Sequence, residues 1–309
     1  MGAIVTVLVT GATGFIGLNF LAEFDDDDVR ALVRPNSPTA RLPADVETVT
    51  GDLSDPDSLV DALEGIDSVV HLAAAVYDQT AMAPTNVAGT DHLLAATADA
   101  GVERFVFAST IGAHPAVPAD ADSPYQQSKV AAEELLFDRE HPFEVSAIYP
   151  TYIFGPRDYR LTRYEHVRPI ASNRVLVPPL YTDAKYNIVH VSDVVETIRY
   201  CLTTDDGGRH LVTGPNLSNK QVLTTIAQHT PGSCRVVSVP YGVIRWGVKP
   251  TMDLLHRVGI SPVPGAGFTE REDYGTVDPN LAEQAPVSQH SWEAAIGDTV
   301  AWYEEVGLL

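Results

Sequence analysis

Short and long blocks of hydrophobic residues alternate along the first half of the chain. Short runs rich in β-branched residues are typical of buried strands, whereas apolar residues three or four apart over a longer block are typical of helices. The short runs predict strands at 4–9, 29–33, 47–50, 68–72, 104–108 and 145–149. The longer blocks predict helices at 15–24, 55–63, 85–100 and 125–139, the second of them capped by Ser54 or Asp55. Repeated strand–helix units with continuously apolar strands predict an α/β fold with a Rossmann-type, doubly wound parallel sheet.

The junction between the first strand and the first helix, VLVTGATGFIG at 7–17, carries three glycines spaced three apart. A strand, a glycine turn and a helix N-terminus together present backbone N–H groups to a phosphate. Gly11 would permit the tight turn, Gly14 would let a pyrophosphate approach the backbone, and Gly17 would let the helix pack closely on the strand. Because a second strand follows to complete a βαβ unit, nucleotide binding is favoured over a purely structural turn.

The pattern changes after Pro150, where prolines break up an arginine-rich segment and the predicted strands become short. Further helices are predicted at 191–202, 219–229 and 291–305. We therefore expect a dinucleotide-binding Rossmann domain at 1–155, with about 187–213 returning to its sheet. The remainder of 156–309 would form a smaller, mainly substrate-binding lobe.

Composition narrows the class of protein. With 309 residues, of which 45% are hydrophobic, the chain can bury a large core. The nearly uncharged stretch 2–22 has no basic leader and is interrupted by glycines, which argues against a signal peptide or a membrane span. Two cysteines, Cys201 and Cys234, fit a reducing, cytoplasmic compartment. The ten histidines are scattered without ligand spacing, so no metal site is expected.

The charge balance is strongly acidic. The formal net charge is −21, Asp outnumbers Glu, and only four of the twenty basic residues are Lys. Such a surface disfavours nucleic acid and anionic membranes as partners and leaves a small-molecule substrate. We interpret it as adaptation to a high-salt, halophilic environment, where screening relieves self-repulsion. The aspartate run at 25–28 is expected to be a solvated loop rather than a metal site.

Candidate catalytic residues follow the fifth predicted strand. Ser109 and Thr110 end that strand, and Tyr125 and Lys129 lie four residues apart on the next helix, which places them on one face. Tyrosine titrates near pH ~10, so a neighbouring ammonium, joined by the positive nicotinamide of an oxidised cofactor, would lower its pKa and make it a workable acid–base. The Thr110 hydroxyl could hydrogen-bond the same substrate oxygen. An exposed helix pair is the alternative, but the position behind a dinucleotide loop favours catalysis.

Eight short motifs together are specific to one family. They are TGATGFIG at 10–17, GDL at 51–53, HLAAA at 71–75, NVAGT at 86–90, ST at 109–110, YQQSK at 125–129, YPTYIFGP at 149–156 and IVHVSDV at 188–194. With them the chain resembles the extended branch of the short-chain dehydrogenase/reductase (SDR) superfamily, the NAD-dependent epimerase/dehydratase family.

This resemblance implies roles for individual residues. Tyr125 would be the acid–base, Lys129 would bind the nicotinamide ribose and tune Tyr125, and Thr110 would orient the substrate oxygen. Asn86 would support the active site from its helix. The implied cofactor contacts also include adenine bracketed by Asp52 and Leu53, Ala73 along the cofactor, a nicotinamide pocket shaped by Pro150 and Ile153, and the loop residues Gly11, Thr13, Gly14, Phe15, Ile16 and Gly17 with Ser109. Dimers of this branch often form through two long helices, here those at 85–100 and 125–139.

The end of the second strand bears on the choice of cofactor. An acidic residue there accepts hydrogen bonds from the ribose 2′-hydroxyl, whereas Arg accommodates a 2′-phosphate. Arg34 occupies this position, and Asn36, Ser37 and Arg41 follow closely. In so acidic a chain these arginines favour NADP(H) over NAD(H).

Departures from the family pattern bear on the reaction. Ile111 and Gly112 stand where sugar dehydratases of the family carry Asp-Glu, so dehydration is not expected. His114 lies in a loop that differs from the family pattern and is left open between surface and function. Tyr149 replaces a common Arg before Pro150, with no effect assigned.

Three functions stay open on the sequence. The arginine at the second strand favours an NADPH-linked reductase of the kind of dihydroflavonol reductases and hydroxysteroid dehydrogenases. A nucleotide-sugar epimerase is the alternative, because five arginines within eighteen residues could grip a diphosphate, although they could equally pair with the acidic surface: Arg157, Arg160, Arg163, Arg168 and Arg174. A non-catalytic NADP-binding sensor is the third, and the presence of both Tyr125 and Lys129 argues against it.

Overall fold

The computed structural model describes residues 6–23, 29–117, 122–172, 175–176, 185–205, 207–232, 234–237, 246–247, 249–258, 276–278, 281, 285–287 and 289–309. The aspartate run at 25–28 and Arg174 lie outside these residues.

A seven-stranded sheet forms the larger part of the molecule. Its order is β10-β6-β5-β4-β1-β2-β3, and every neighbouring pair is parallel. The strands are β1 (Val7–Thr10), β2 (Val29–Val33), β3 (Glu47–Thr50), β4 (Ser68–His71), β5 (Arg104–Ala108), β6 (Glu144–Pro150) and β10 (Gly208–Val212). The order runs outward in both directions from β1, which confirms the doubly wound Rossmann-type sheet.

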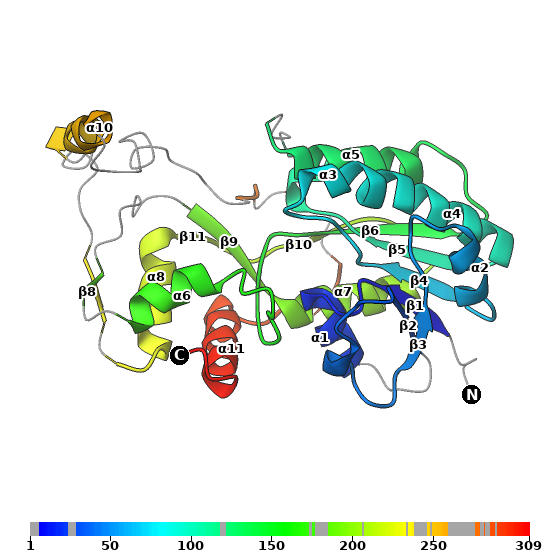
Figure 1. The fold of residues 1–309 in the computed structure, drawn as a ribbon, viewed down its shortest axis with the longest axis horizontal. Coiled ribbons are helices and arrows are strands. Elements are labelled where there is room, and N and C mark those ends of the chain that lie inside the picture. The colour runs from blue at the N-terminus through cyan, green and yellow to red at the C-terminus, as the bar shows by residue number, and fades with distance from the viewer. Residues whose placement is uncertain are drawn as a thin grey trace.

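Helices cover both faces of this sheet (Figure 1). Alternate residues of each strand point to opposite faces, so Val7 and Val9 belong to one buried cluster and Leu8 to the other. The first cluster includes side chains of α1 (Phe15–Glu23) and α7 (Val191–Thr203). The second includes those of α2 (Asp57–Ala62), α4 (Gly89–Ala100) and α5 (Pro124–Phe137). Burial on both sides explains why the inner strands are largely apolar, whereas the edge strand β3 is mostly exposed.

Two predicted helix starts differ in the structure. The prediction that Ser54 or Asp55 caps the second helix is wrong, because α2 begins at Asp57 without a side-chain cap. The Ser54 hydroxyl instead donates to the Asp52 carboxylate at 2.8 Å. The helical segment predicted at 85–100 starts earlier, at Gln79, and consists of three pieces: α3 (Gln79–Met82), a π-helical turn η3 (Ala83–Ala88) and α4.

A smaller group of elements lies beside the carboxyl edge of the sheet, to the left in Figure 1. Its three-stranded sheet has the order β11 (Asn216–Ser218), β9 (Lys185–His190) and β7 (Tyr152–Phe154), antiparallel for β11 with β9 and parallel for β9 with β7. The helices are α6 (Tyr164–Ala171), α8 (Asn219–His229), α10 (Lys249–Arg257) and α11 (Trp292–Glu305), and β8 (Val175–Leu176) pairs with β12 (Arg235–Val236). A third buried cluster joins α6, α8 and α11 to this sheet. Within 187–213, β10 pairs with the large sheet, whereas β9 belongs to the small one.

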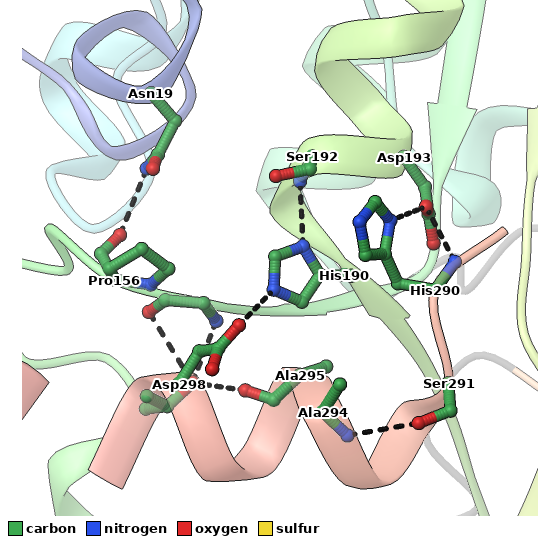
Figure 2. A network of polar contacts seen from close by, with 12 residues as sticks. Asn19, Pro156, His190, Ser192, Asp193, His290, Ser291, Ala294, Ala295 and Asp298 are labelled. Carbon is green, nitrogen blue, oxygen red and sulfur yellow. Dashed lines mark hydrogen bonds and ion pairs between the residues drawn. The ribbon is translucent and has the colours of Figure 1, made fainter. Parts of the chain in front are cut away.

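Polar contacts join the two groups of elements (Figure 2). The Asn19 amide of α1 donates to the Pro156 carbonyl at 2.9 Å. His190, which ends β9 and caps α7 of the larger group, contacts the Asp298 carboxylate of α11 at 3.0 Å, and His290 contacts the Asp193 carboxylate of α7 at 2.7 Å. The two imidazole rings stack with their centroids 4.7 Å apart. The junction thus depends on side chains separated by about a hundred residues.

Candidate functional site

Backbone atoms pack closely against the glycine loop that follows β1. Gly11 has φ +69°, and a Cβ there would lie 2.6 Å from the Ala73 backbone N. A Cβ on Gly17 would lie 2.5 Å from the Gly11 carbonyl oxygen. The first backbone N–H groups of α1, which begins at Phe15, have no partners within the helix. A glycine cradle that opens a helix fits a dinucleotide pyrophosphate.

The residues predicted for the adenosine end lie at the ends of β2 and β3. Arg34 is exposed, and its backbone N–H donates to the Ser37 hydroxyl at 3.0 Å, so Ser37 holds the turn that carries Arg34. The pKa of Asp52 is lowered by hydrogen bonds from the Ser54 backbone and hydroxyl and by the positive charge of Arg34. Leu53 is buried behind Asp52. Arg34 and Asp52 therefore interact electrostatically at this edge of the sheet.

Two other residues of that region differ in their surroundings. Asn36 is exposed beside Arg34. The guanidinium of Arg41 lies 4.4 Å from the centre of the Tyr159 ring, in the segment that follows β7. Arg41 therefore links the cofactor side of the site to the smaller lobe.

Asn86 ties the loop after β4 to α5. Its amide oxygen accepts from the Ala75 backbone N–H at 2.7 Å, and its amide nitrogen donates to the Ala75 carbonyl and to the Ser128 hydroxyl, both at 2.9 Å. Ser128 in turn donates to the Tyr125 carbonyl at 2.7 Å. The π-helical turn that contains Asn86 brings this buried amide to the loop that carries Ala73.

Tyr125 is half-buried at the N-terminal end of α5. Burial and the neighbouring Tyr77 raise its pKa to about 12, and the positive charge of Arg160 acts in the opposite direction. This corrects the expectation that Lys129 lowers the pKa of Tyr125 in the protein itself. The cation that acts on the phenol is Arg160, from the arginine-rich segment after β7.

Lys129 lies deeper and points toward β5. Its ammonium donates to the Ala108 carbonyl at 2.6 Å and sits 4.2 Å from the centre of the Phe107 ring. Burial lowers its pKa to about 7, and the carboxylate of Glu133 acts against this shift. The spacing of four residues places Lys129 on the same face as Tyr125, but its ammonium is hydrogen-bonded to the Ala108 carbonyl of β5.

The ends of β5 and β6 complete the site. Thr110 follows β5 and begins the short helix η4 (Ile111–Ala113), with no side-chain cap there. The Ser109 hydroxyl donates to the Glu133 carboxylate, and the predicted contact of Ser109 with the cofactor stays a prediction. Pro150 ends β6, and Ile153 is buried in β7.

Sequence reasoning missed Glu133 and left Tyr149 and His114 without roles. The Tyr149 hydroxyl donates to Glu133 at 2.6 Å, and the His114 ring packs edge-on against Tyr149 with centroids 4.7 Å apart. Burial and Glu133 raise the pKa of Tyr149, so its hydroxyl remains a donor. The signal was present, because Glu133 follows Lys129 at the spacing by which Lys129 follows Tyr125.

The arginine-rich segment does not converge on one point. Arg157 donates to the Asn19 side chain at 3.1 Å, and Arg163 donates to the Ile153 carbonyl at 2.7 Å and stacks on Tyr152. Arg168 lies in α6. Arg160 is exposed, and its charge reaches Tyr125.

Two negative findings concern the described ranges alone. They contain no group of three or more His, Cys, Asp or Glu side chains that could hold a metal ion. No helix within them is long and apolar enough to cross a membrane.

Comparison with known proteins extends the resemblance. The model of the NAD dependent epimerase/dehydratase family matches residues 7–214. Sterol demethylase protein B of Methylococcus capsulatus is 28% identical over 98% of this chain and 100% of its own length. A putative dihydroflavonol 4-reductase of Synechocystis is 28% identical over 97% of this chain and 95% of its own length. The N-acetyl-alpha-D-glucosaminyl-diphospho-ditrans,octacis-undecaprenol 4-epimerase of Escherichia coli O157:H7 is 30% identical over 76% of this chain and 75% of its own length.

The family match covers more than half of the chain, including the glycine loop, β5, α5 and β6. It confirms the resemblance derived from the motifs. The relatives include a reductase and an epimerase, so both chemistries occur among proteins of this similarity. The chain therefore belongs to the NAD-dependent epimerase/dehydratase family of extended short-chain dehydrogenases/reductases and is an NAD(P)-binding enzyme of oxidoreductase or epimerase type.

Proposed function

We propose that the protein is an NADPH-linked oxidoreductase that interconverts a carbonyl and an alcohol on a small molecule. The observation that carries this proposal is a convergence at one edge of the sheet: the glycine loop follows β1, Thr110 follows β5, and Tyr125 begins α5. Ligands of doubly wound sheets bind at the carboxyl ends of the strands. A phosphate cradle and a proton donor at that edge fit a hydride donor and a substrate oxygen.

The protonation state of Tyr125 supports reduction. A phenol whose pKa is raised to about 12 keeps its proton at neutral pH and can donate it to a substrate oxygen. Thr110 would hydrogen-bond the same oxygen, and Lys129 would bind the ribose. The bound cofactor supplies the hydride. The half-buried position of Tyr125 limits water around the reacting oxygen.

Preference for NADPH rests on Arg34. It is exposed at the end of β2, where a ribose 2′-phosphate would meet its positive charge. Arg34→Ala should weaken NADPH at least about tenfold and leave NADH nearly unchanged. Fluorescence titration with both dinucleotides measures this, with Arg235→Ala, an exposed arginine of β12, as the control. Equal affinities in the wild-type protein would contradict the preference.

The oxidoreductase itself is tested by turnover. NADPH consumption is measured with a panel of ketones and aldehydes, and Tyr125→Phe should lose at least about a hundredfold in kcat while retaining NADPH binding. Full activity of Tyr125→Phe would exclude the proposed proton donor. Wild-type inactivity on every carbonyl and sugar substrate, with NADPH still bound, would favour the sensor.

A nucleotide-sugar epimerase is the second candidate, because the epimerase relative shares 30% identity and the exposed Arg160 lies within electrostatic reach of Tyr125. An epimerase retains its cofactor through turnover, whereas a reductase releases it. Heat denaturation of the purified protein, followed by identification of any released dinucleotide, separates the two. Tightly held NAD would favour the epimerase, and a protein that arrives empty and takes up NADPH would favour the reductase.

We also propose a homodimer of cytoplasmic protein that forms through α4 and α5. These helices lie side by side and share one face of the sheet, and Arg139, just after the end of α5, forms an ion pair with Asp91 of α4 at 2.5 Å (Figure 1). Light scattering after size exclusion measures the mass. Ala95→Arg, at an exposed position of α4, should yield monomers, whereas Lys220→Glu on α8 should not.

A further inference from the structure

Three polar side chains follow one another along the inner face of α5. Tyr125, Lys129 and Glu133 are spaced by four residues, which places them on the same side of the helix. Lys129 is 2% exposed and Glu133 is 5% exposed. The proposed reaction uses the first two, whereas Glu133 has no part in it. A buried carboxylate is costly unless its oxygens have partners.

Glu133 joins the ends of two strands. The Ser109 hydroxyl donates to its Oε1 atom, and the Tyr149 hydroxyl donates to its Oε2 atom at 2.6 Å. Ser109 directly precedes Thr110, and Tyr149 directly precedes Pro150. Both carboxylate oxygens therefore act as acceptors, as an ionised carboxylate does.

We propose that Glu133 is a positioning residue of the site, whose buried carboxylate stabilises the charged form of Lys129 and fixes the ends of β5 and β6 through Ser109 and Tyr149. Glu133 would thus act on the cofactor and the substrate through other residues. Within this proposal, only the effect of Lys129 on a bound dinucleotide rests on the proposed function.

The charges around Lys129 leave Glu133 as its counter-ion. From β4 it faces His71, whose pKa burial and the nearby ammonium lower to about 3, so that ring is neutral. From β5 it faces the Phe107 ring and the Ala108 carbonyl, and from its own helix Glu133.

The surroundings of Glu133 itself are of mixed sign. Burial raises the pKa of its carboxyl group, and the Ser109 and Tyr149 hydrogen bonds and the charges of Arg209 and Lys129 oppose that rise. Arg209 comes from β10 and stacks on Phe137 at 3.8 Å, and His114 borders the far edge of Tyr149. The carboxylate thus has two hydroxyl donors and two cations to offset its burial.

Removing the negative charge makes a directional prediction. In Glu133→Gln, the buried ammonium of Lys129 loses the anion that opposes its desolvation, so its pKa should fall by about one unit from its value near 7. Tyr149→Phe leaves the carboxylate but removes a donor that favours its charged form, so it should shift Lys129 in the same direction by less. A role in packing alone would change stability without moving this titration.

The chain has only four lysines, Lys129, Lys185, Lys220 and Lys249, which makes a direct measurement practical. Protein labelled with 13C at the lysine Cε is titrated by NMR without cofactor, and Lys129→Met identifies the resonance. Wild type, Glu133→Gln, Tyr149→Phe and the exposed neighbour Glu134→Gln are compared. The expected result is a lower titration midpoint for Lys129 in the first two variants and an unchanged one in Glu134→Gln.

The proposal is wrong if Glu133→Gln leaves the titration midpoint of Lys129 unchanged or raises it. It is also wrong if Glu134→Gln changes this midpoint as much as Glu133→Gln does. If Glu133→Gln does not fold, Tyr149→Phe decides. In parallel, the NADPH dissociation constant is measured against pH. The pH at which affinity is lost should move with the Lys129 midpoint in each variant. A wild-type protein that binds no dinucleotide would refute the proposed function, while the lysine titration would still decide the role of Glu133.

Discussion

Two polar networks of this protein differ in how they treat their charges. Beneath α5, the ionisable groups Lys129 and Glu133 are both buried. At the junction between the lobes, each pair joins a buried to an exposed group: the side chains of His190 and Asp298 are 5% and 58% exposed, and those of Asp193 and His290 are 4% and 48% exposed (Figure 2). We call the first network sealed, because both of its charged groups are shielded from water, whereas each pair of the second network has one exposed member.

This difference in exposure separates a network suited to catalysis from one that holds the two lobes together. A sealed ammonium loses hydration, so its pKa falls toward neutrality, where it can respond to a ligand. A half-exposed pair keeps part of its hydration and contributes modestly, but the two pairs connect the start of α7 to α11 and to the residues just before it. Burial at the edge of the parallel sheet therefore shifts the pKa of groups that an ordinary helical spacing brings together.

The largest effect is expected for Glu133→Ala. It leaves the Ser109 and Tyr149 hydroxyls without their acceptor and opens a cavity, so the free energy of unfolding should fall by about 3 kcal/mol. Glu134→Ala, on the exposed side of the same helix, should change it by less than about 0.5 kcal/mol. Urea denaturation measures both. Equal small losses would mean that the network beneath α5 is not sealed.

A smaller loss is expected for the buried member of a junction pair. The Asp193 carboxylate accepts from the His290 backbone N–H at 2.9 Å and contacts its ring at 2.7 Å. Asp193→Ala should cost about 2 kcal/mol, whereas Asp298→Ala, which removes the exposed member of the other pair, should cost less than about 1 kcal/mol. If Asp298→Ala proves the costlier variant, exposure is the wrong criterion for the junction.

The sequence predicted the sheet more fully than the networks. Strands β2 and β5 begin and end where the apolar runs do, because a strand buried on both faces is visible in local hydropathy. The exposed edge strand β3 also has its predicted bounds. The spacing of Tyr125 and Lys129 is local too. The direction of the Lys129 ammonium is not, because it depends on a carbonyl of β5 that packing brings beneath the helix.

The residues that were missed share a physical reason. Glu133 continues the spacing of four residues from Tyr125 and Lys129, but a glutamate in a helix has the sequence character of a solvated position. That spacing does not show that this side of α5 faces the ends of β5 and β6. His190 and Asp298 are 108 residues apart, so no local pattern relates them. The short strands β7 and β11 have three residues each, too few to display a period.

The pH dependence of stability tests the sealed network in another way. The pKa of Lys129 is lowered from 10.5 to about 7 on folding, so above pH 7 the unfolded chain holds a proton that the folded protein has released. Stability should therefore rise with pH from about 7 toward 10.5, by about 1 kcal/mol per pH unit from this group. Lys129→Met should lose that slope, whereas Lys220→Met, at an exposed position, should keep it. Denaturation at pH 7, 8 and 9 compares the slopes, and parallel curves for wild type and Lys129→Met would contradict the shift.

Salt should separate the networks by the smallest effects. The screening length falls to about 3 Å at 1 M salt, which weakens exposed pairs and leaves buried ones nearly unchanged. Added KCl should thus erase the cost of Asp298→Ala and preserve that of Glu133→Ala. The same salt should raise the thermal midpoint of the wild-type protein, because a net charge of −21 repels itself when unscreened. Calorimetry across a KCl series measures the two variant costs and the wild-type thermal midpoint. A midpoint that stays flat or falls would contradict salt adaptation. A cost of Glu133→Ala that changes with salt would show that water reaches the α5 network.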